Sequence, residues 1–340
     1  MRPLAYHRPA DGAEAVEMVA GDPDAAFLGG GSNLVDHLKL GVARPGALVD
    51  VTGLPMSSVE VSDDRLRVGA NVRNSDLAAH PVIRTRYPVV ARALLSGASG
   101  QIRHQATTAG NLLQRTRCVY FQDVTTPCNK REPGSGCSAA EGYGRYNAIL
   151  GASPQCVAVH PSDLAVALAA VDADVVVLGR EGERRIPVTD LHRLPGDRPD
   201  QDTVLEHGDL ITAVELPRIG VARWSTYYKV RDRASYAFAL VSVAAALELE
   251  GDPDRTVRDV RIAWGGVAHK PWRARHVEDA VRDHPFSSAL VREAVGRELA
   301  AAETGRENAF KVPMLVNTTV HVLERLARDG VSRDAVGGTR

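Results

Sequence analysis

The four cysteines of the chain are the residues whose grouping most clearly suggests chemistry. Cys118, Cys128, Cys137 and Cys156 are the only cysteines among 340 residues, and all of them lie between residues 112 and 156. Glycines and prolines punctuate this stretch, and so long an irregular loop in a compact protein is usually functional or disordered. The grouping therefore predicts a site that the cysteines build together.

Three kinds of site could use these thiols. Two disulfides would suit an oxidising compartment, although a chain with a large hydrophobic core does not need such links. Zinc sites usually have closely paired cysteines, unlike the gaps of nine, eight and eighteen residues here. A [4Fe–4S] cluster needs four thiolates, which a wrapping loop can supply at irregular spacing. We favour the cluster, with zinc and disulfides as alternatives, because the loop has glycines that could curl around it: Gly134, Gly136, Gly142 and Gly144.

A glycine-rich loop is the second feature that could bind a ligand. Residues 29–33 read Gly-Gly-Gly-Ser-Asn and follow a short apolar segment, residues 25–28, that is typical of a buried strand. Consecutive glycines let backbone N–H groups face an anion without a Cβ in the way. The Rossmann fingerprint fits poorly, because Leu34 stands where its third glycine would be. The loop is therefore either a phosphate-binding loop of another kind or a tight turn.

A second loop rich in small residues spans residues 97–111 and ends in Thr107-Thr-Ala-Gly-Asn111. Its hydroxyl groups and glycines could pack closely against a flat or phosphorylated ligand. Taken alone, it could also be an ordinary surface loop. The presence of two such loops in one chain favours phosphate binding over two unrelated turns.

The two loops resemble those of the FAD-binding subunit or domain of the xanthine dehydrogenase/aldehyde oxidoreductase family, which includes the medium subunit of molybdenum carbon monoxide dehydrogenase. In that family a glycine-rich loop and a T-x-G-G-N loop hold the FAD diphosphate from both sides. Here Ala109 replaces the first glycine of the second motif, a change that matters only if this position needs a positive φ. Further similarity extends along the chain, in segments 162–164, 209–217, 227–236 and 258–268.

The resemblance implies an α+β fold with two domains. Residues 1–220 would form a two-part FAD-binding domain of the vanillyl-alcohol-oxidase (PCMH) type. It would comprise a small α/β subdomain (1–55) and a mixed α/β subdomain (56–220), with a cluster-binding insertion at 112–156. Residues 222–330 would form an α+β C-terminal domain like that of carbon monoxide dehydrogenase flavoprotein.

The hydrophobic pattern predicts elements that suit this division. In residues 1–55, apolar strands alternate with helices, a βαβ rhythm that indicates a small parallel sheet. Residues 59–69 alternate as two strands around a turn at 63–64, with helices around 74–79, 88–95 and 162–171. After about residue 222, strands at 226–231, 236–249 and 258–268 precede helices at 274–282, 287–303 and 312–328. That order is typical of an α+β domain with antiparallel strands.

The resemblance also assigns residues to the FAD. Asp163 would hydrogen-bond the ribityl chain, and the segment with Leu210 and Ile211 would lay an apolar side chain near the isoalloxazine. Lys229 would place near the ring a positive charge that stabilises anionic reduced flavin, although it could instead be a surface lysine on an edge strand. The expected FAD-binding residues are Phe27, Leu28, Gly29, Gly30, Gly31, Ser32, Asn33, Leu34, Ser99, Ile102, Ala106, Thr107, Gly110, Asn111, Ser162, Asp163, Leu210, Ile211 and Lys229.

No side chain is expected to act as a catalytic residue, because the flavin itself performs the redox step. His104, His160 and His207 are candidate bases, but single histidines in loops are usually solvated or structural. The sequence contains no Ser-His-Asp or metalloprotease pattern that would point to another chemistry.

The segments around the cysteines resemble a known insertion. Residues 115–121 and 128–137 are similar to an insertion in the periplasmic-type bacterial aldehyde oxidoreductase branch of the family, where the loop holds a [4Fe–4S] cluster. The resemblance thus implies that Cys118, Cys128, Cys137 and Cys156 ligate such a cluster. The cluster would either relay electrons or order a loop that contacts a partner subunit.

The function implied is that of an electron-transfer subunit in a heterotrimer. In the family, a large subunit oxidises the substrate at a molybdenum cofactor, and a small subunit carries two [2Fe–2S] clusters. The FAD subunit passes the electrons to an external acceptor. Four cysteines are too few for both [2Fe–2S] clusters, so this chain fits the third role. The alternatives are a self-contained flavin oxidase or dehydrogenase acting on a small molecule, and a non-enzymatic assembly subunit that holds zinc.

Composition narrows the partners and the location. The chain is 44% hydrophobic and 24% charged with a net charge of −1, so no excess of basic residues indicates nucleic acid or an anionic membrane surface. No apolar stretch reaches the roughly 18 residues of a membrane span, and the N-terminus lacks the apolar core of a signal peptide. We expect a chain without its own export signal, located in the cytoplasm or exported to the periplasm on a partner's twin-Arg signal.

Overall fold

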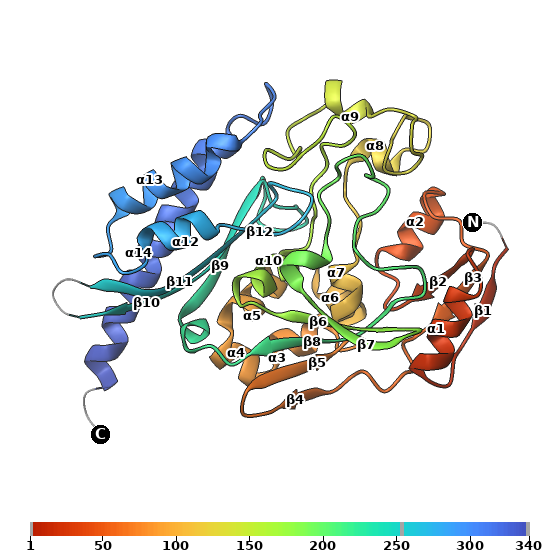
Figure 1. Ribbon diagram of the computed structural model, residues 1–340, viewed down its shortest axis with the longest axis horizontal. Coiled ribbons are helices and arrows are strands. Elements are labelled where there is room, and N and C mark those ends of the chain that lie inside the picture. Colours follow the sequence, from red (N-terminus) through yellow and green to blue (C-terminus); the bar gives the residue numbers. More distant parts are fainter. Residues whose placement is uncertain (1–2, 252–254, 338–340) are drawn as a thin grey trace.

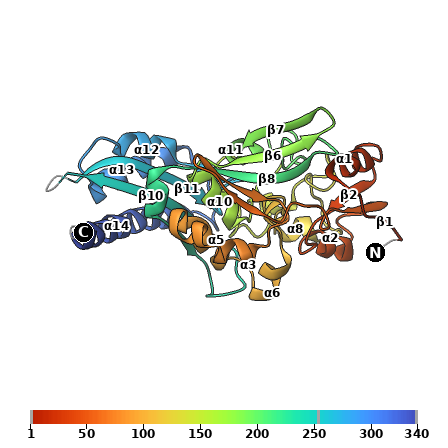
Figure 2. The ribbon, with the colours of Figure 1, turned by 90° about the horizontal axis from the view of Figure 1, so that it is seen from below.

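The computed structural model describes residues 3–251 and 255–337, and its strands form three separate sheets. Figure 1 shows these sheets in chain order, from the N-terminal sheet at one end of the molecule to the C-terminal sheet at the other. The same succession along the long axis is seen from below in Figure 2. None of the helices in the described ranges is long and apolar enough to cross a membrane.

The first sheet is small and parallel, as the βαβ rhythm predicted. It contains β1 (Ala5–His7), β2 (Ala25–Leu28) and β3 (Ala47–Asp50) in the order β1-β3-β2. Helix α1 (Gly12–Ala20) begins after Asp11, whose carboxylate accepts a hydrogen bond from the Glu14 backbone and satisfies a free N–H at the helix start. Helix α2 (Leu34–Leu40) ends at Gly41 in a left-handed conformation.

The second sheet has five antiparallel strands in the order β4-β5-β8-β6-β7. The predicted strands on either side of the turn at 63–64 are confirmed as β4 (Val59–Val61) and β5 (Arg65–Gly69). The other three strands are β6 (Asp174–Gly179), β7 (Gly182–Pro187) and β8 (Leu210–Pro217). In the sequence, helices α3 (Asn74–Ala79), α4 (Pro81–Arg86), α5 (Pro88–Ser96) and α10 (Asp163–Ala170) lie between β5 and β6, and α11 (Val188–Leu191) follows β7.

The second small-residue loop is more regular than the sequence indicated. Residues 97–111 contain two short helices, α6 (Gly100–Gln105) and α7 (Thr108–Leu112), instead of a continuous loop. Each begins after a hydroxyl residue: the Ser99 Oγ accepts from the Ile102 backbone N–H, and the Thr107 Oγ1 accepts from that of Gly110. These side-chain caps stabilise the first turn of helices too short to show a hydrophobic period.

The third sheet is antiparallel, with the order β12-β11-β10-β9. Its strands are β9 (Ser225–Val230), β10 (Val241–Glu250), β11 (Thr256–Gly265) and β12 (Trp272–Arg273). The strand expected at 236–249 begins only at Val241. Tyr236 has a left-handed φ of +52°, which excludes this residue from an extended strand. The expected helices form as α12 (Arg275–Val281), α13 (Ser288–Glu298) and α14 (Lys311–Gly337), with short 3-10 turns at Gly220–Trp224 and Leu299–Ala301.

Helix α10 joins the second and third sheets. All eight of its residues are buried, as expected of a helix that is apolar on every side. One hydrophobic cluster contains Leu164 and Leu168 of α10, strands of the five-stranded sheet, and Ala244 and Ala263 of β10 and β11. The start of α10, at Ser162 and Asp163, is thereby fixed at the junction of the two sheets.

The cysteine-bearing segment, residues 112–156, is irregular as predicted, with two single-turn helices, α8 (Val119–Gln122) and α9 (Ser138–Glu141). Figure 1 shows it as a group of loops extending beyond the sheets. Its C-terminal part is held by the C-terminal domain. The Ile149 and Leu150 backbone N–H groups donate to the carbonyl of Val267, and Lys311 on α14 donates to the carbonyls of Tyr146 and Asn147.

Candidate functional site

The glycine-rich loop and the second loop lie directly against each other. Residues 29–33 connect β2 to α2, and a Cβ on Gly30 would overlap the carbonyl of Gln105 at the end of α6. The Gln105 side-chain amide donates to the Gly30 carbonyl at 3.0 Å. Gly31 has a φ of +73°, which favours glycine. The contact between the two loops therefore requires glycine at position 30 even without a bound ligand.

A groove with two cavities runs between these loops. One cavity of about 260 Å³ is lined by the glycine-rich loop, and the second, of about 310 Å³, continues from Ser32 and Asn33 toward Lys229. The first contains the predicted residues Phe27, Gly29, Gly30, Gly31, Ser32, Asn33, Leu34, Thr107, Gly110, Leu210 and Ile211. The second contains the predicted residues Ser32, Asn33, Ser99, Ile102, Ala106, Gly110, Asn111, Asp163 and Lys229.

Two expected residues lie outside this groove. Leu28 lines neither cavity, because successive side chains of a strand alternate in direction and its neighbour Phe27 faces the groove. Ser162 begins α10, where its Oγ accepts from the Ala165 backbone and donates to the Asn111 side-chain oxygen at 2.6 Å. It thus supports a groove residue from behind. Leu210 and Ile211 line the glycine-loop cavity, whereas Lys229 lines the other cavity.

Lys229 and Asp163 form a buried ion pair at the far end of the groove. The Lys229 Nζ lies 2.8 Å from the Asp163 Oδ2, and the two side chains are 4% and 10% exposed. The other carboxylate oxygen accepts from the Tyr227 hydroxyl at 2.5 Å. Burial beside the carboxylate raises the pKa of Tyr227 well above its ordinary value, so this hydroxyl remains a donor. Lys229 is therefore not the surface lysine that the sequence left possible.

Several groove residues were missed by the sequence reasoning. Arg117, Tyr236 and Phe238 line the Lys229 cavity, and the Arg117 guanidinium lies 5.2 Å from the centre of the Phe238 ring. Burial lowers the pKa of Arg117 from its ordinary value. Arg117 was detectable only as a neighbour of Cys118. Phe238 lay within the range mistaken for a strand, so neither signalled the groove.

The four cysteines converge on one small cavity. Cys118, Cys128, Cys137 and Cys156 all line it, and all four are free thiols. No set of three His, Cys, Asp or Glu side chains in the described ranges is arranged to hold a single metal ion. Four thiols therefore line the cavity, but no three of them are close enough together to bind one metal ion.

Local geometry explains how widely spaced cysteines meet. Cys128 and Cys137 face each other in a short antiparallel bridge, closed by a turn in which Gly134 and Gly136 have φ of +87° and +104°. The Asn129 side chain then donates to the backbone and side-chain oxygens of Gln155, at 3.1 and 2.9 Å, which holds the Cys156 segment beside the bridge.

Burial governs the protonation of these thiols. It raises the pKa of Cys118, although backbone N–H groups of Phe121 and Tyr120 oppose the shift. Burial also raises the pKa of Cys156 to about 11, against the charge of Lys130. At neutral pH both are therefore protonated unless bound cations compensate the thiolate charge.

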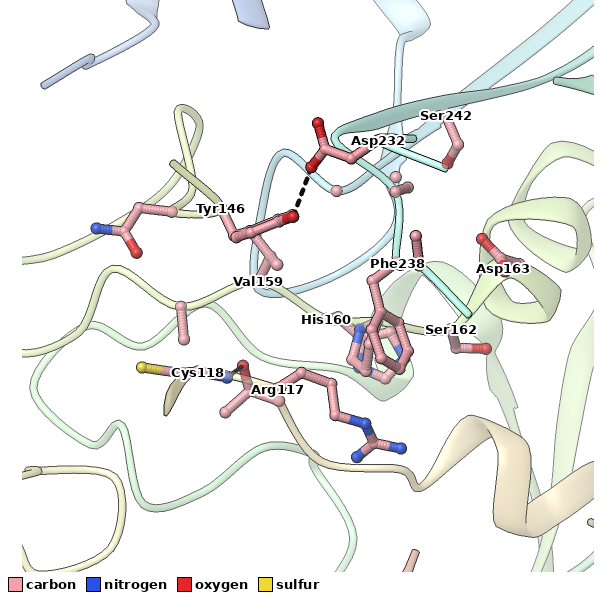
Figure 3. A pocket seen from close by; sticks show the side chains of 18 of the residues that line it. Arg117, Cys118, Tyr146, Val159, His160, Ser162, Asp163, Asp232, Phe238 and Ser242 are labelled. Atoms are coloured by element: carbon pink, nitrogen blue, oxygen red, sulfur yellow. Dashed lines mark hydrogen bonds between the residues drawn. The ribbon is translucent and has the colours of Figure 1, made fainter. Parts of the chain in front are cut away.

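A third cavity, of about 300 Å³, lies between the groove and the cysteines (Figure 3). It shares Arg117, Asp163 and Phe238 with the Lys229 end of the groove, and Cys118 with the cysteine cavity. Figure 3 shows Cys118 and Asp163 on different sides of this cavity, with the Tyr146 hydroxyl donating to Asp232 at 2.6 Å. The groove and the cysteine site are thus neighbours in space.

The three histidines considered as bases do not form a catalytic site. His160 lines the third cavity, where its ring contacts that of His192 at a tilt of 45°, with centroids 4.1 Å apart. Burial lowers the pKa of His160 well below its ordinary value, so the ring is neutral. His104 and His207 are exposed, and the His207 ring contacts the carbonyl of Asp22.

Comparison with known proteins gives consistent matches over most of the chain. Residues 2–219 match the family described as the FAD binding domain in molybdopterin dehydrogenase, and residues 226–325 match the CO dehydrogenase flavoprotein C-terminal domain. The aldehyde oxidoreductase FAD-binding subunit PaoB of Escherichia coli (strain K12) is 48% identical over 95% of this chain and 98% of its own. The carbon monoxide dehydrogenase medium chain of Hydrogenophaga pseudoflava is 23% identical over 89% of this chain and 88% of its own.

Solved structures share the fold. A structure of carbon monoxide dehydrogenase from Hydrogenophaga pseudoflava has a chain with a TM-score of 0.74 at 21% identity, covering 95% of this chain and 96% of that one. Quinoline 2-oxidoreductase from Pseudomonas putida 86 also gives a TM-score of 0.74, at 20% identity, covering 97% and 98%. The α+β fold class expected from the sequence is confirmed.

Proposed function

Because the chain belongs to the family of FAD-binding subunits of molybdopterin-dependent dehydrogenases, we propose that it binds FAD in the groove and transfers electrons within an aldehyde-oxidising complex. The observation that carries the proposal is the contact between two small-residue loops across a groove that continues to a buried lysine. The FAD supplies the redox chemistry, and the chain supplies position and charge.

The residues of the groove fit each part of FAD. Residues 29–33 offer backbone N–H groups for the diphosphate, and Ser32 and Thr107 add hydroxyls at close range. The backbone N–H groups of residues 108–111 donate within the chain. Asp163, at the start of α10, would accept hydrogen bonds from the ribityl chain. Lys229 would hold a positive charge near the ring, where it favours the reduced anion. Both cavities share Ser32, Asn33 and Gly110, so the groove is continuous from the two loops to Lys229.

We further propose that the four cysteines ligate a [4Fe–4S] cluster. Their convergence on one cavity from irregularly spaced positions supports it, since a four-thiolate cluster needs such a ring of ligands. The free state of all four thiols disfavours the disulfide alternative. The gaps of nine, eight and eighteen residues between the cysteines are unlike the closely paired cysteines of zinc sites, which disfavours zinc.

The partners proposed are a large subunit with the molybdenum cofactor, where the aldehyde is oxidised, and a small [2Fe–2S] subunit. PaoB is named as the FAD-binding subunit of an aldehyde oxidoreductase, which supports this arrangement. Electrons would leave through FAD to an external acceptor. A periplasmic location would depend on export with a partner that carries a twin-Arg signal.

Two measurements on purified protein test this function. Heat or acid should release one free FAD per chain, because the glycine-rich loop, residues 29–33, contains no histidine to which the flavin could be attached. Flavin that stays with the precipitated polypeptide contradicts non-covalent binding. Under anaerobic conditions, an aldehyde should bleach the flavin absorbance of the complete complex and leave that of the isolated chain unchanged. Bleaching of the isolated chain would instead identify a self-contained flavin enzyme.

A further inference from the structure

A buried lysine lies beside the cysteine cavity. Among the residues described as lining that cavity, Lys130 is the only one with a charged side chain. The side chain is 4% exposed, and its Nζ donates to the Pro199 carbonyl at 2.8 Å and to the Asp202 Oδ1 at 2.5 Å. A cation held this rigidly out of water acts strongly on any charge in the cavity.

Asp202 is shared between two cations. Its second carboxylate oxygen lies 2.6 Å from the Arg115 Nε, so Lys130, Asp202 and Arg115 form an ion-pair triad. Arg115 lines the glycine-loop cavity, and its backbone N–H donates to the Asn33 side-chain oxygen at 2.9 Å. The triad therefore extends from the FAD-binding loop to the cysteine cavity.

We propose that this triad sets the reduction potential of the cysteine-bound cluster, with Lys130 favouring the reduced state and Asp202 moderating it. The inference rests on the proposed function, because it assumes that the four cysteines hold the cluster. Lys130, Asp202 and Arg115 are positioning residues. Their charges act on the cluster electrostatically, and none of the three is a ligand of it.

The charges predict opposite shifts. Adding one electron to the cluster adds negative charge next to Lys130, so the lysine stabilises the reduced form. Asp202 opposes this effect, and because its side chain is 30% exposed, solvent weakens its action. Arg115 partly neutralises Asp202 and lies toward the flavin groove, so its removal has a smaller effect of the same sign as removal of Lys130.

The test is a redox titration of the complete complex followed by electron paramagnetic resonance. The signal of this cluster is identified as the one lost in Cys137→Ser. Lys130→Met should shift the equilibrium toward the oxidised cluster about tenfold, equivalent to about 59 mV for one electron. Arg115→Gln should shift it less in the same direction. Asp202→Asn should shift it toward the reduced cluster.

Lys39→Met serves as a control, since Lys39 is an exposed lysine on α2, and it should leave the potential unchanged. Equal potentials in wild type, Lys130→Met and Asp202→Asn, with full iron in all three, would overturn the inference alone. Loss of iron from both variants with FAD retained would make the triad a structural support and also overturn it. Absence of this iron from the wild-type chain would overturn the cluster proposal itself.

Discussion

Gly30 shows how one residue position joins the two halves of the proposed flavin site. A Cβ at this position would overlap the Gln105 carbonyl, so the glycine-rich loop could not lie against α6. We predict that Gly30→Ala lowers the affinity for FAD at least tenfold by separating the two loops. Gly100→Ala is the matched control, because a Cβ there meets nothing within 4 Å. Fluorescence titration of the apoprotein measures both; equal affinities would contradict the loop-contact account.

Lys229 offers a second residue-scale prediction. Its charge lies at the end of the groove where the flavin ring is proposed to bind, paired with Asp163. We predict that Lys229→Met retains FAD but lowers its reduction potential by the equivalent of about 1–2 kcal/mol, because the reduced anion loses a nearby positive charge. A spectroscopic redox titration measures the change. An unchanged potential would show that the lysine only neutralises Asp163.

Among single residues, the sequence identified those whose residue type alone indicates a chemical role, such as cysteine. Cysteines are rare in the chain, so the grouping of Cys118, Cys128, Cys137 and Cys156 was visible without a structure. It could not reveal Lys130 and Asp202 as a pair, because they are 72 positions apart and meet only through tertiary folding. Leu28 was wrongly placed among the residues lining the groove, because the sequence does not show whether the Leu28 or the Phe27 side chain faces it. Neighbouring side chains of a strand point in opposite directions.

Among the elements, strand β8 carries a buried carboxylate that forms ion pairs with three arginines. Glu215 is 5% exposed, and its carboxylate lies 2.9 Å from Arg65 and 2.6 Å from Arg67, both on β5, and 3.0 Å from Arg185 on β7. Burial alone would raise the pKa of Glu215, but hydrogen bonds from Arg185, Arg65 and Arg67 prevail and lower it to about 2. The cluster therefore ties β5 and β7 to β8.

Glu215→Gln should lower the free energy of unfolding by about 1–2 kcal/mol at pH 7, since the arginines are partly solvated. A folded pKa below the unfolded one gives stability that is present above about pH 4.5 and lost as the pH falls toward 2. The difference from wild type should therefore shrink over that range. Denaturant unfolding measures this difference in the free energy of unfolding. Glu183→Gln is the control: the Glu183 side chain is 42% exposed, so its substitution should change that free energy by close to zero. A difference independent of pH would exclude the ionised carboxylate as its cause.

The elements predicted correctly were those with a clear period. The βαβ rhythm of residues 1–55 and the two strands around residues 63–64 were confirmed because alternation reports directly on one buried face. Helices α6 and α7 were missed, since six and five residues are too few to show a helical period and depend on their Ser99 and Thr107 caps. The expected strand was too long at its start, where it included Tyr236, because no apolar pattern indicates a left-handed φ.

For the whole molecule, Lys311 connects three regions. It is fully buried on α14, and its Nζ donates to the carbonyls of Tyr146 at 3.1 Å, Asn147 at 2.8 Å and Gly266 at 2.8 Å. The C-terminal domain thus holds the end of the cysteine-bearing segment. These contacts tie a segment with little regular structure to helix α14.

We predict that Lys311→Met lowers the free energy of unfolding by roughly 3 kcal/mol, because three carbonyls lose their donor and at least one remains buried. Differential scanning calorimetry should show a lower Tm. Arg325→Met on the same helix is the control, since Arg325 is 49% exposed and its ion pair with Asp329 is long, at 3.9 Å. Equal Tm values for Lys311→Met and wild type would mean that other contacts hold the segment.

The measurement that tests the central claim most directly is the iron and FAD content of the anaerobically purified complex, compared between wild type and Cys137→Ala. Partner subunits contribute equally to both preparations, so the difference belongs to this chain. The account predicts that the variant loses about four irons per complex and keeps its FAD, because the flavin loops and the cysteine cavity share no residue. Equal iron in both preparations, or the loss of stoichiometric zinc in place of iron, would contradict it.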